Sequence, residues 1–323
     1  MKEITLLGCG ISGAAFIERM RENGFTDKII LIDKKNYYSQ RESSLSCPAD
    51  FKRCWDIEEW AKEKNVEFIE AKVERVNIRR RKLYFKQHEA RDFQQLVVAA
   101  GMESKKLSLK GEHREGFFYL SDIDAWKLKD LLKLSPEACV WVSTFLGVKL
   151  ALSLANLGKE VRVVAENLNF LGSRVQELLD YLGQKGISLY LNSRVEEAVG
   201  EARIKAIKIS PLKVFPSQLL FVDSGFTPNK DFLEEESGEE PLAGDIVSAA
   251  SQEVHFIGDI ASKNIGEEFF FKFNHIRAKK SALALADCIA KGESPVVEEM
   301  FLSEEDKNKI IDEFLTKQEC SSS

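Results

Sequence analysis

Short apolar runs separated by charged segments define the expected elements of this 323-residue chain. Residues 2–7, 28–32 and 96–99 each carry an apolar stretch too short for a helix, which is typical of a parallel strand buried on both faces. Residues 138–142 and 160–165 have the same character and lie on either side of a helical stretch. Strands that alternate with helices predict an α/β fold with parallel sheets.

A more polar region lies between the second and third of these strands. Residues 66–69, 72–78 and 82–86 have the composition of short strands. The basic run 79–81 fits the solvated tip of a hairpin. Before them, residues 36–64 mix charged and aromatic side chains, and we expect a long loop with a short helix there.

A glycine motif follows the first strand directly. Gly8, Gly10 and Gly13 form the pattern G-x-G-x-x-G. Such glycines allow a tight turn, the approach of a pyrophosphate to the backbone, and close packing of helix on strand. Asp33 ends the next strand, at the spacing expected of a carboxylate that binds a ribose hydroxyl. The motif, strand, helix and acid together predict a dinucleotide site.

The composition limits the classes of function. With 44% hydrophobic and 30% charged residues, the chain can form the cores of two domains of ordinary size. A formal charge of −6 argues against nucleic acid or an anionic membrane as the main partner, because both bind basic surfaces. Without a secretion signal or an apolar stretch of roughly 20 residues, we expect a cytoplasmic protein with no membrane span. Six cysteines lack zinc-like spacing, so we expect no metal.

Four motifs, in order along the chain, resemble those of one superfamily. They are the first glycine motif with Asp33, the strand end 98–101, the segment 225–229 and the strand end 254–259. Together they resemble the FAD-dependent pyridine nucleotide-disulphide oxidoreductase superfamily, notably its NADH oxidase and its rubredoxin and ferredoxin reductase members. The resemblance extends over about residues 2–292.

This resemblance implies two Rossmann-like dinucleotide-binding domains of three layers (ββα), the second inserted into the first. The FAD-binding domain would comprise residues 1–103 and 226–292, and the NAD(P)-binding-like domain residues 104–225. A helical tail would occupy residues 293–323.

The resemblance also implies which residues bind FAD. These are Gly8, Gly10, Ile11, Ser12, Gly13, Asp33, Lys34, Arg41, Val73, Ala100, Gly101, Gly258 and Asp259. Asp259 stands at a strand end beside a helix start, where a carboxylate can bind the ribityl hydroxyls while nearby N–H groups face the pyrophosphate.

The second βαβ unit departs from the superfamily pattern. In its loop, residues 142–147, only Gly147 is a glycine. Thr144 stands where backbone would approach a pyrophosphate, so its side chain would crowd the phosphates, although its hydroxyl could donate one hydrogen bond. Glu166 ends the following strand and would favour NAD over its 2′-phosphorylated form. We expect Gly147 and Glu166 to contact NAD(H) only if this altered loop binds it.

Cysteine chemistry beside the flavin has two interpretations. The spacing of Cys47 and Cys54 differs from that of the superfamily's redox pairs. Residues 44–47 resemble the single-cysteine loop of NADH peroxidases, NADH oxidases and coenzyme A-disulphide reductases, whose thiol cycles through sulfenic acid or a mixed disulfide. Residues 37–41 instead resemble rubredoxin and ferredoxin reductases, which lack that thiol. Cys47 is therefore either a catalytic residue or an ordinary thiol.

The end of the chain differs from the long superfamily members, whose C-terminal dimerisation domain supplies an acid-base histidine. The superfamily resemblance stops near Gly292, so this histidine is not expected and the oligomeric state stays open. Ser303 and Asp306 predict a capping box that starts a last helix. The apolar stripe of that helix is Ile310, Ile311, Phe314 and Leu315. Its acidic character disfavours a membrane anchor, and we expect it to pack on the parent fold rather than on a partner.

The predicted function is an FAD-dependent oxidoreductase that passes electrons from NADH through flavin to a redox protein, quinone or oxygen. One alternative is a flavoprotein subunit of an electron-transfer complex that has lost nicotinamide binding. A second alternative is a peroxide or CoA-disulphide reductase that uses Cys47. The loop 37–54 is expected to line the acceptor side.

Overall fold

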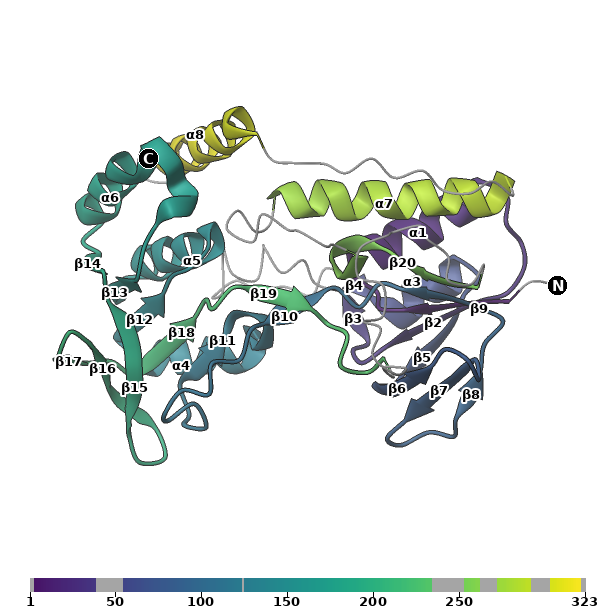
Figure 1. Ribbon diagram of the computed structural model, residues 1–323, viewed down its shortest axis with the longest axis horizontal. Coiled ribbons are helices and arrows are strands. Elements are labelled where there is room, and N and C mark those ends of the chain that lie inside the picture. Colours follow the sequence, from purple (N-terminus) through teal and green to yellow (C-terminus); the bar gives the residue numbers. More distant parts are fainter. Residues whose placement is uncertain are drawn as a thin grey trace.

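The computed structural model describes residues 3–38, 55–123, 125–233, 253–261, 272–291 and 303–320. Two lobes lie side by side, and each contains a five-stranded parallel sheet (Figure 1). None of the helices in the described ranges combines the length and apolar character needed to cross a bilayer.

The first lobe has the strand order β20-β9-β1-β2-β5. These strands are β1 (Ile4–Leu7), β2 (Ile29–Asp33), β5 (Glu67–Glu70), β9 (Gln95–Val98) and β20 (Val254–Phe256). Helices α1 (Ile11–Glu22), α3 (Ile57–Glu63) and α7 (Lys272–Lys291) contribute to the core on one face. The antiparallel sheet of β6 (Val73–Asn77), β7 (Lys82–Phe85) and β8 (Arg91–Asp92) covers the other. Within β2, Ile29 and Leu31 pack with the helices, while Ile30 and Ile32 pack toward the antiparallel sheet.

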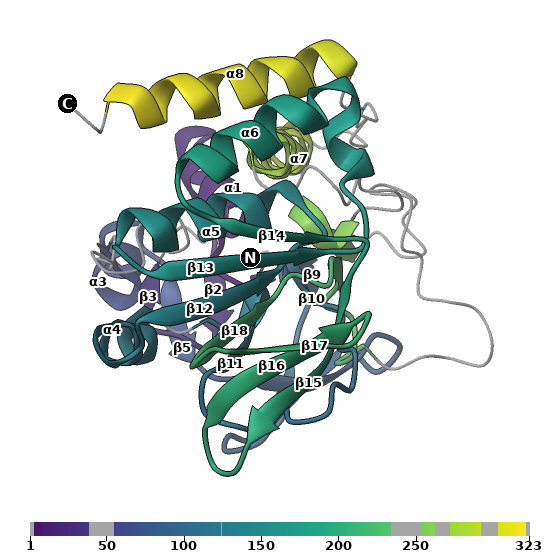
Figure 2. The same cartoon turned by 90° about the vertical axis from the view of Figure 1, so that its left-hand side faces the viewer.

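The second lobe repeats this plan with the order β11-β18-β12-β13-β14. Its parallel strands are β11 (Phe117–Tyr119), β12 (Glu137–Trp141), β13 (Glu160–Ala165), β14 (Ser188–Leu191) and β18 (Leu219–Val222). Helices α4 (Ala125–Leu134), α5 (Phe145–Asn156) and α6 (Val175–Gln184) pack into the core on one face. The antiparallel strands β15 (Arg194–Gly200), β16 (Ile204–Ser210) and β17 (Lys213–Pro216) cover the other (Figure 2). The predicted pair of three-layer units is therefore present.

Two paired strands connect the lobes. β10 (Met102–Ser104) runs antiparallel to β19 (Phe226–Pro228), and both lie between the lobes in Figure 1. Of the domain boundaries proposed from the sequence, 103/104 lies within β10 and 225/226 lies immediately before β19. Both boundaries stay predictions.

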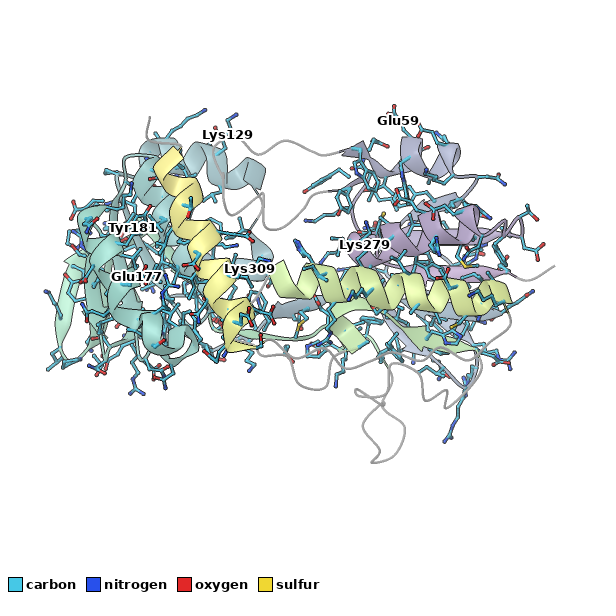
Figure 3. All side chains as sticks on the ribbon, turned by 90° about the horizontal axis from the view of Figure 1, so that it is seen from above. Glu59, Lys129, Glu177, Tyr181, Lys279 and Lys309 are labelled. Atoms are coloured by element: carbon cyan, nitrogen blue, oxygen red, sulfur yellow. The ribbon has the colours of Figure 1, made fainter. Side chains whose placement is uncertain are left out.

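The last helix, α8 (Glu304–Cys320), packs on the second lobe. The backbone N–H of Ser303 donates to Asp306 Oδ2, and the N–H of Asp306 donates to Ser303 Oγ, both at 3.1 Å. The capping box is therefore confirmed. Ile311 and Phe314 are buried in the core of the second lobe, which confirms packing on the parent fold. Figure 3 shows α8 across this lobe beside Glu177 and Tyr181 of α6.

The expected loop over residues 36–64 contains a short strand pair. β3 (Tyr37–Tyr38) pairs with β4 (Trp55–Asp56), and the rings of Tyr38 and Trp55 stack with centroids 4.4 Å apart. Two-residue strands give too short a pattern to be found in the sequence. The short helix expected there is α3.

Candidate functional site

The carboxyl ends of strands in the first lobe open into a cavity of about 610 Å³. Ligands of open parallel sheets bind at this edge. The residues predicted to bind FAD that line the cavity are Gly8, Asp33, Lys34, Val73 and Ala100. They come from four separate segments, which the fold brings together.

The three positions of the first loop require glycine for different structural reasons. Gly8 has a φ of +101°, and a Cβ there would lie 2.6 Å from the carbonyl oxygen of Ala99. A Cβ on Gly13 would overlap the carbonyl oxygen of Gly8. At Gly10, in contrast, a Cβ would meet no atom within 4 Å. Gly8 and Gly13 are therefore required by the chain's own packing, whereas the open space at Gly10 fits a bound phosphate.

The N-terminus of α1 fits an anion. Its N-cap is Gly10, which has no side chain to accept from the first N–H groups of the helix, and no acidic residue lies in the first turn. The positive end of the helix dipole is therefore not compensated by a carboxylate of that turn. Ile11 and Ser12 begin the helix, and a Cβ on Gly258 would lie 2.5 Å from Ser12 Oγ. The 3₁₀ turn η3 (Gly258–Ala261), with the predicted Asp259, thus starts directly beside the start of α1.

Asp33 is held beside the loop by backbone N–H groups. Its Oδ2 accepts from the N–H of Cys9 at 2.7 Å, and its Oδ1 accepts from that of Lys35 at 3.0 Å. The carboxylate is half-buried at the end of β2, as expected for a ribose ligand. Cys9 itself is buried, and burial together with Asp33 raises the pKa of its thiol, so it is not a candidate nucleophile.

Several cavity residues were not predicted from the sequence. These are Lys72, Glu74, Glu103, Asp122, Asn229 and Asp231. Asn229 belongs to the quoted segment 225–229, and its N–H donates to the carbonyl oxygen of Gly101 at 3.0 Å. The motif therefore held the signal for Asn229. Burial and the nearby Asp231 raise the pKa of Glu103.

In the second lobe, the N-terminus of α5 is the counterpart of the N-terminus of α1, and a side chain of the protein itself lies there. Asp223, which has no exposed surface, follows β18 and lies at the N-terminus of α5. Its Oδ2 accepts from the N–H groups of Ser143, Thr144 and Gly147 at 3.2, 2.7 and 3.2 Å. The hydroxyl of Thr144 also donates to it, at 2.9 Å. Thr144 therefore has the predicted donor role, but its acceptor is Asp223.

Asp223 explains why Gly147 is a glycine. A Cβ on Gly147 would lie 2.5 Å from Asp223 Oδ2, so this glycine makes room for a carboxylate of the protein. Burial raises the pKa of Asp223, and the hydrogen bonds from Thr144 oppose that shift. Asp223 was not predicted from the sequence, although it comes directly after the apolar run 219–222, much as Asp33 comes after the apolar run 29–32.

The remaining predicted residues lie elsewhere. Gly147 and Glu166 belong to the second lobe, and Glu166 is exposed after β13. Arg41 and Cys47 lie outside the described residues. The two interpretations of Cys47 therefore both stay open as predictions.

Comparison with known proteins identifies the family. The profile described as "Pyridine nucleotide-disulphide oxidoreductase" matches residues 2–274. The chain belongs to this family. Membership confirms the superfamily predicted from the motifs, the α/β class with Rossmann-like units, and the enzyme class, an FAD-dependent oxidoreductase family that uses NAD(H).

Individual relatives within this family are distant. Apoptosis-inducing factor 3 from Homo sapiens is 27% identical over 248 residues, which cover 71% of this chain and 40% of that protein. The benzene 1,2-dioxygenase system ferredoxin–NAD(+) reductase subunit of Pseudomonas putida is 20% identical over 275 residues, covering 80% of this chain and 67% of the relative. The chain therefore spans less than half the length of the first relative.

The fold is shared with solved reductases. The ferredoxin reductase of the CYP199A2 system from Rhodopseudomonas palustris superposes with a TM-score of 0.78 at 18% identity. The match covers 92% of this chain and 78% of that one. Such a likeness describes the architecture of both lobes.

Proposed function

We propose that this chain is an FAD-dependent oxidoreductase domain whose first lobe holds FAD and transfers electrons through it to an acceptor. The observation that carries this proposal is the open N-terminus of α1 beside the cavity lined by Gly8, Asp33 and Ala100. A helix N-terminus with free N–H groups, a backbone loop without side chains and an adjacent carboxylate form the set that binds a dinucleotide.

The residues of the chain have distinct roles in this proposal. The loop from Gly8 to Gly13 and the first turn of α1 bind the pyrophosphate. Asp33 accepts hydrogen bonds from a ribose, and Asp259 from the ribityl chain. Gly101 and Gly258, both with positive φ, turn the backbone at the edges of the site. Bound flavin would supply hydride and single-electron transfer, and the protein binds, orients and shields it.

The electron partners are proposed from the relatives' names. A ferredoxin–NAD(+) reductase subunit is among the relatives, which supports a redox protein as the partner and NADH as the expected donor. Quinone and oxygen are the alternative acceptors. A Cys47-dependent peroxide or CoA-disulphide reductase is a further proposal, and Cys47→Ser with full turnover would exclude it.

A second candidate is supported by Asp223. In this candidate, the chain is a flavoprotein subunit that receives electrons from a partner, because its second lobe no longer takes nicotinamide dinucleotides. The hydrogen bonds to Asp223 at the start of α5 favour it.

The test is anaerobic stopped-flow absorbance of the FAD-loaded protein mixed with NADH and, separately, with NADPH. Rapid bleaching by NADH establishes a nicotinamide-dependent reductase. An oxidised flavin in both mixtures, together with retained FAD, favours the partner-fed subunit. A protein that cannot retain FAD at all contradicts the proposal.

A further inference from the structure

The two βαβ units can be aligned residue by residue through their sheets. β1 pairs with β9 so that Leu7 faces Val98, and β12 pairs with β18 so that Trp141 faces Val222. Each pair is followed by the same backbone hydrogen bond. The N–H of Ala99 donates to Leu7 O at 2.7 Å. In the second lobe, the N–H of Asp223 donates to Trp141 O at 2.9 Å. Ala99 and Asp223 are therefore structural counterparts.

This alignment places the two glycine loops in register. Gly8, Gly10 and Gly13 correspond to Val142, Thr144 and Gly147. The position after the neighbouring strand is a methyl group in the first lobe and a carboxylate in the second. A methyl group accepts no hydrogen bond, whereas the carboxylate accepts from the N–H groups of Thr144 and Gly147 as well as from that of Ser143.

We propose that Asp223 is an internal substitute for the pyrophosphate of a dinucleotide, and that it keeps NAD(H) from the second lobe. Its Oδ2 accepts from the N–H groups of Thr144 and Gly147 at the start of α5, where a Rossmann unit offers N–H groups to a pyrophosphate. The N–H of Ser143 also donates to it, whereas its first-lobe counterpart, Cys9, donates to Asp33. A phosphate there would have to compete with Asp223 for these donors and, with the carboxylate ionised, would meet a like charge.

Two neighbouring contacts stabilise this arrangement. Thr144 caps α5, because its Oγ1 accepts from the N–H of Leu146 at 3.2 Å while its hydroxyl donates to Asp223. Phe145, the first residue of α5, is buried and packs edge-on against Phe314 of α8, with ring centroids 5.1 Å apart. The first turn is therefore held by Asp223 on one side and by the C-terminal helix on another.

The test uses the full chain loaded with FAD and measures binding by calorimetry. The variants are Asp223→Ala, which copies the first lobe, and Asp223→Asn, which keeps the volume and removes the charge. The probes are NAD⁺, which leaves the flavin oxidised, and inorganic pyrophosphate. We expect the wild type to show no saturation with NAD⁺ up to about 1 mM. Asp223→Ala should bind NAD⁺ at least about tenfold more tightly than the wild type, with a smaller gain for Asp223→Asn.

Two results would overturn the inference. One is tight, saturable NAD⁺ binding by the wild type, which can be measured even if no variant folds. The other is the same weak binding in the wild type and in a folded Asp223 variant. The inference rests on the proposed function only for the FAD in the first lobe, and it favours the partner-fed subunit over NADH as the electron donor. Flavin absorbance of each sample therefore separates the two, since loss of FAD by the wild type contradicts the proposed function and not the role of Asp223.

Discussion

The two lobes share one sheet architecture and differ in what lies at the helix N-terminus of each. In the first lobe the start of α1 is bordered by glycines and by Ala99, and it adjoins the cavity. In the second lobe Asp223 accepts hydrogen bonds from the start of α5. The difference depends on one side chain contributed by a neighbouring strand rather than on the loop alone. A glycine motif is therefore informative only together with the residue that follows the adjacent strand.

The largest expected effect comes from Ala99→Asp, which gives the first lobe the arrangement of the second. The new carboxylate would accept from the N–H groups at the start of α1 and repel the pyrophosphate of FAD. We expect FAD affinity to fall by about 100-fold or more, the equivalent of about 2.7 kcal/mol. Equilibrium dialysis of apoprotein with FAD measures it. Ala99→Ser is the uncharged control. Unchanged FAD affinity in Ala99→Asp would contradict the idea that a carboxylate at this position displaces a pyrophosphate.

A smaller effect is expected from Gly10→Ala, which separates packing from ligand space. Gly10 has an ordinary φ of −80° and open space at its Cβ. The free energy of unfolding of the apoprotein should therefore change by less than about 0.5 kcal/mol. FAD affinity should fall by about tenfold or more, because the methyl group occupies the path of the phosphate. Gly183→Ala, in α6 and also with open space, is the control and should leave FAD affinity unchanged. A destabilised Gly10→Ala apoprotein with normal FAD affinity would show that the space is not reserved for a ligand.

The two lobes also show which features could be predicted from the sequence alone. Strands such as β13 were predicted with their observed bounds, because a buried parallel strand leaves a continuous apolar run. Gly8 and Asp33 were predicted from their spacing along the chain, and Ala100 from the superfamily resemblance of the strand end 98–101. Asp223 was missed, since the loop it caps lies 76 to 80 residues away in sequence, and a single acid after a strand has many ordinary explanations. The acids that line the cavity, such as Asp122 and Asp231, gave no local pattern at all.

Asp33→Asn and Glu166→Gln compare the acids at the ends of the second strands. The side chain of Asp33 is fixed by the N–H groups of Cys9 and Lys35 beside the cavity, whereas Glu166 is exposed. Asp33→Asn should weaken FAD binding by about fivefold to tenfold, through loss of a charged acceptor for the ribose. Glu166→Gln should leave FAD binding unchanged and, if Asp223 excludes dinucleotides, NAD⁺ binding as well. The same titrations with FAD and NAD⁺ measure both variants, and equal losses of FAD affinity would remove the distinction between the lobes.

The smallest expected effect concerns the contacts that a C-terminal helix makes with the helix after each glycine loop, α7 with α1 and α8 with α5. In the second lobe α8 packs on α5 through the rings of Phe145 and Phe314, which carry no charge. In the first lobe α7 and α1 share an apolar core. Asp287 of α7 adds a charged contact to α1, because its Oδ1 accepts from Arg19 Nε at 2.6 Å and from Asn23 Nδ2 at 2.8 Å. These hydrogen bonds, that of Arg19 first, lower the pKa of Asp287 below its ordinary value of 3.8.

A lowered carboxyl pKa stabilises the folded state above the ordinary value, and this contribution is lost as the pH falls through the folded pKa. Both side chains are partly exposed, at 38% for Arg19 and 29% for Asp287, so solvent screening keeps the contribution of the pair small. Asp287→Asn should therefore lower the free energy of unfolding only slightly at neutral pH. The difference from the wild type should stay constant down to about pH 5 and shrink below pH 4, as urea titrations at stepped pH would measure. If the difference in free energy of unfolding between the wild type and Asp287→Asn persists undiminished in acid, Asp287 stabilises the contact between α7 and α1 through packing and not through its charge. It would then act as Phe314 does between α8 and α5, and this contrast between the lobes would be lost.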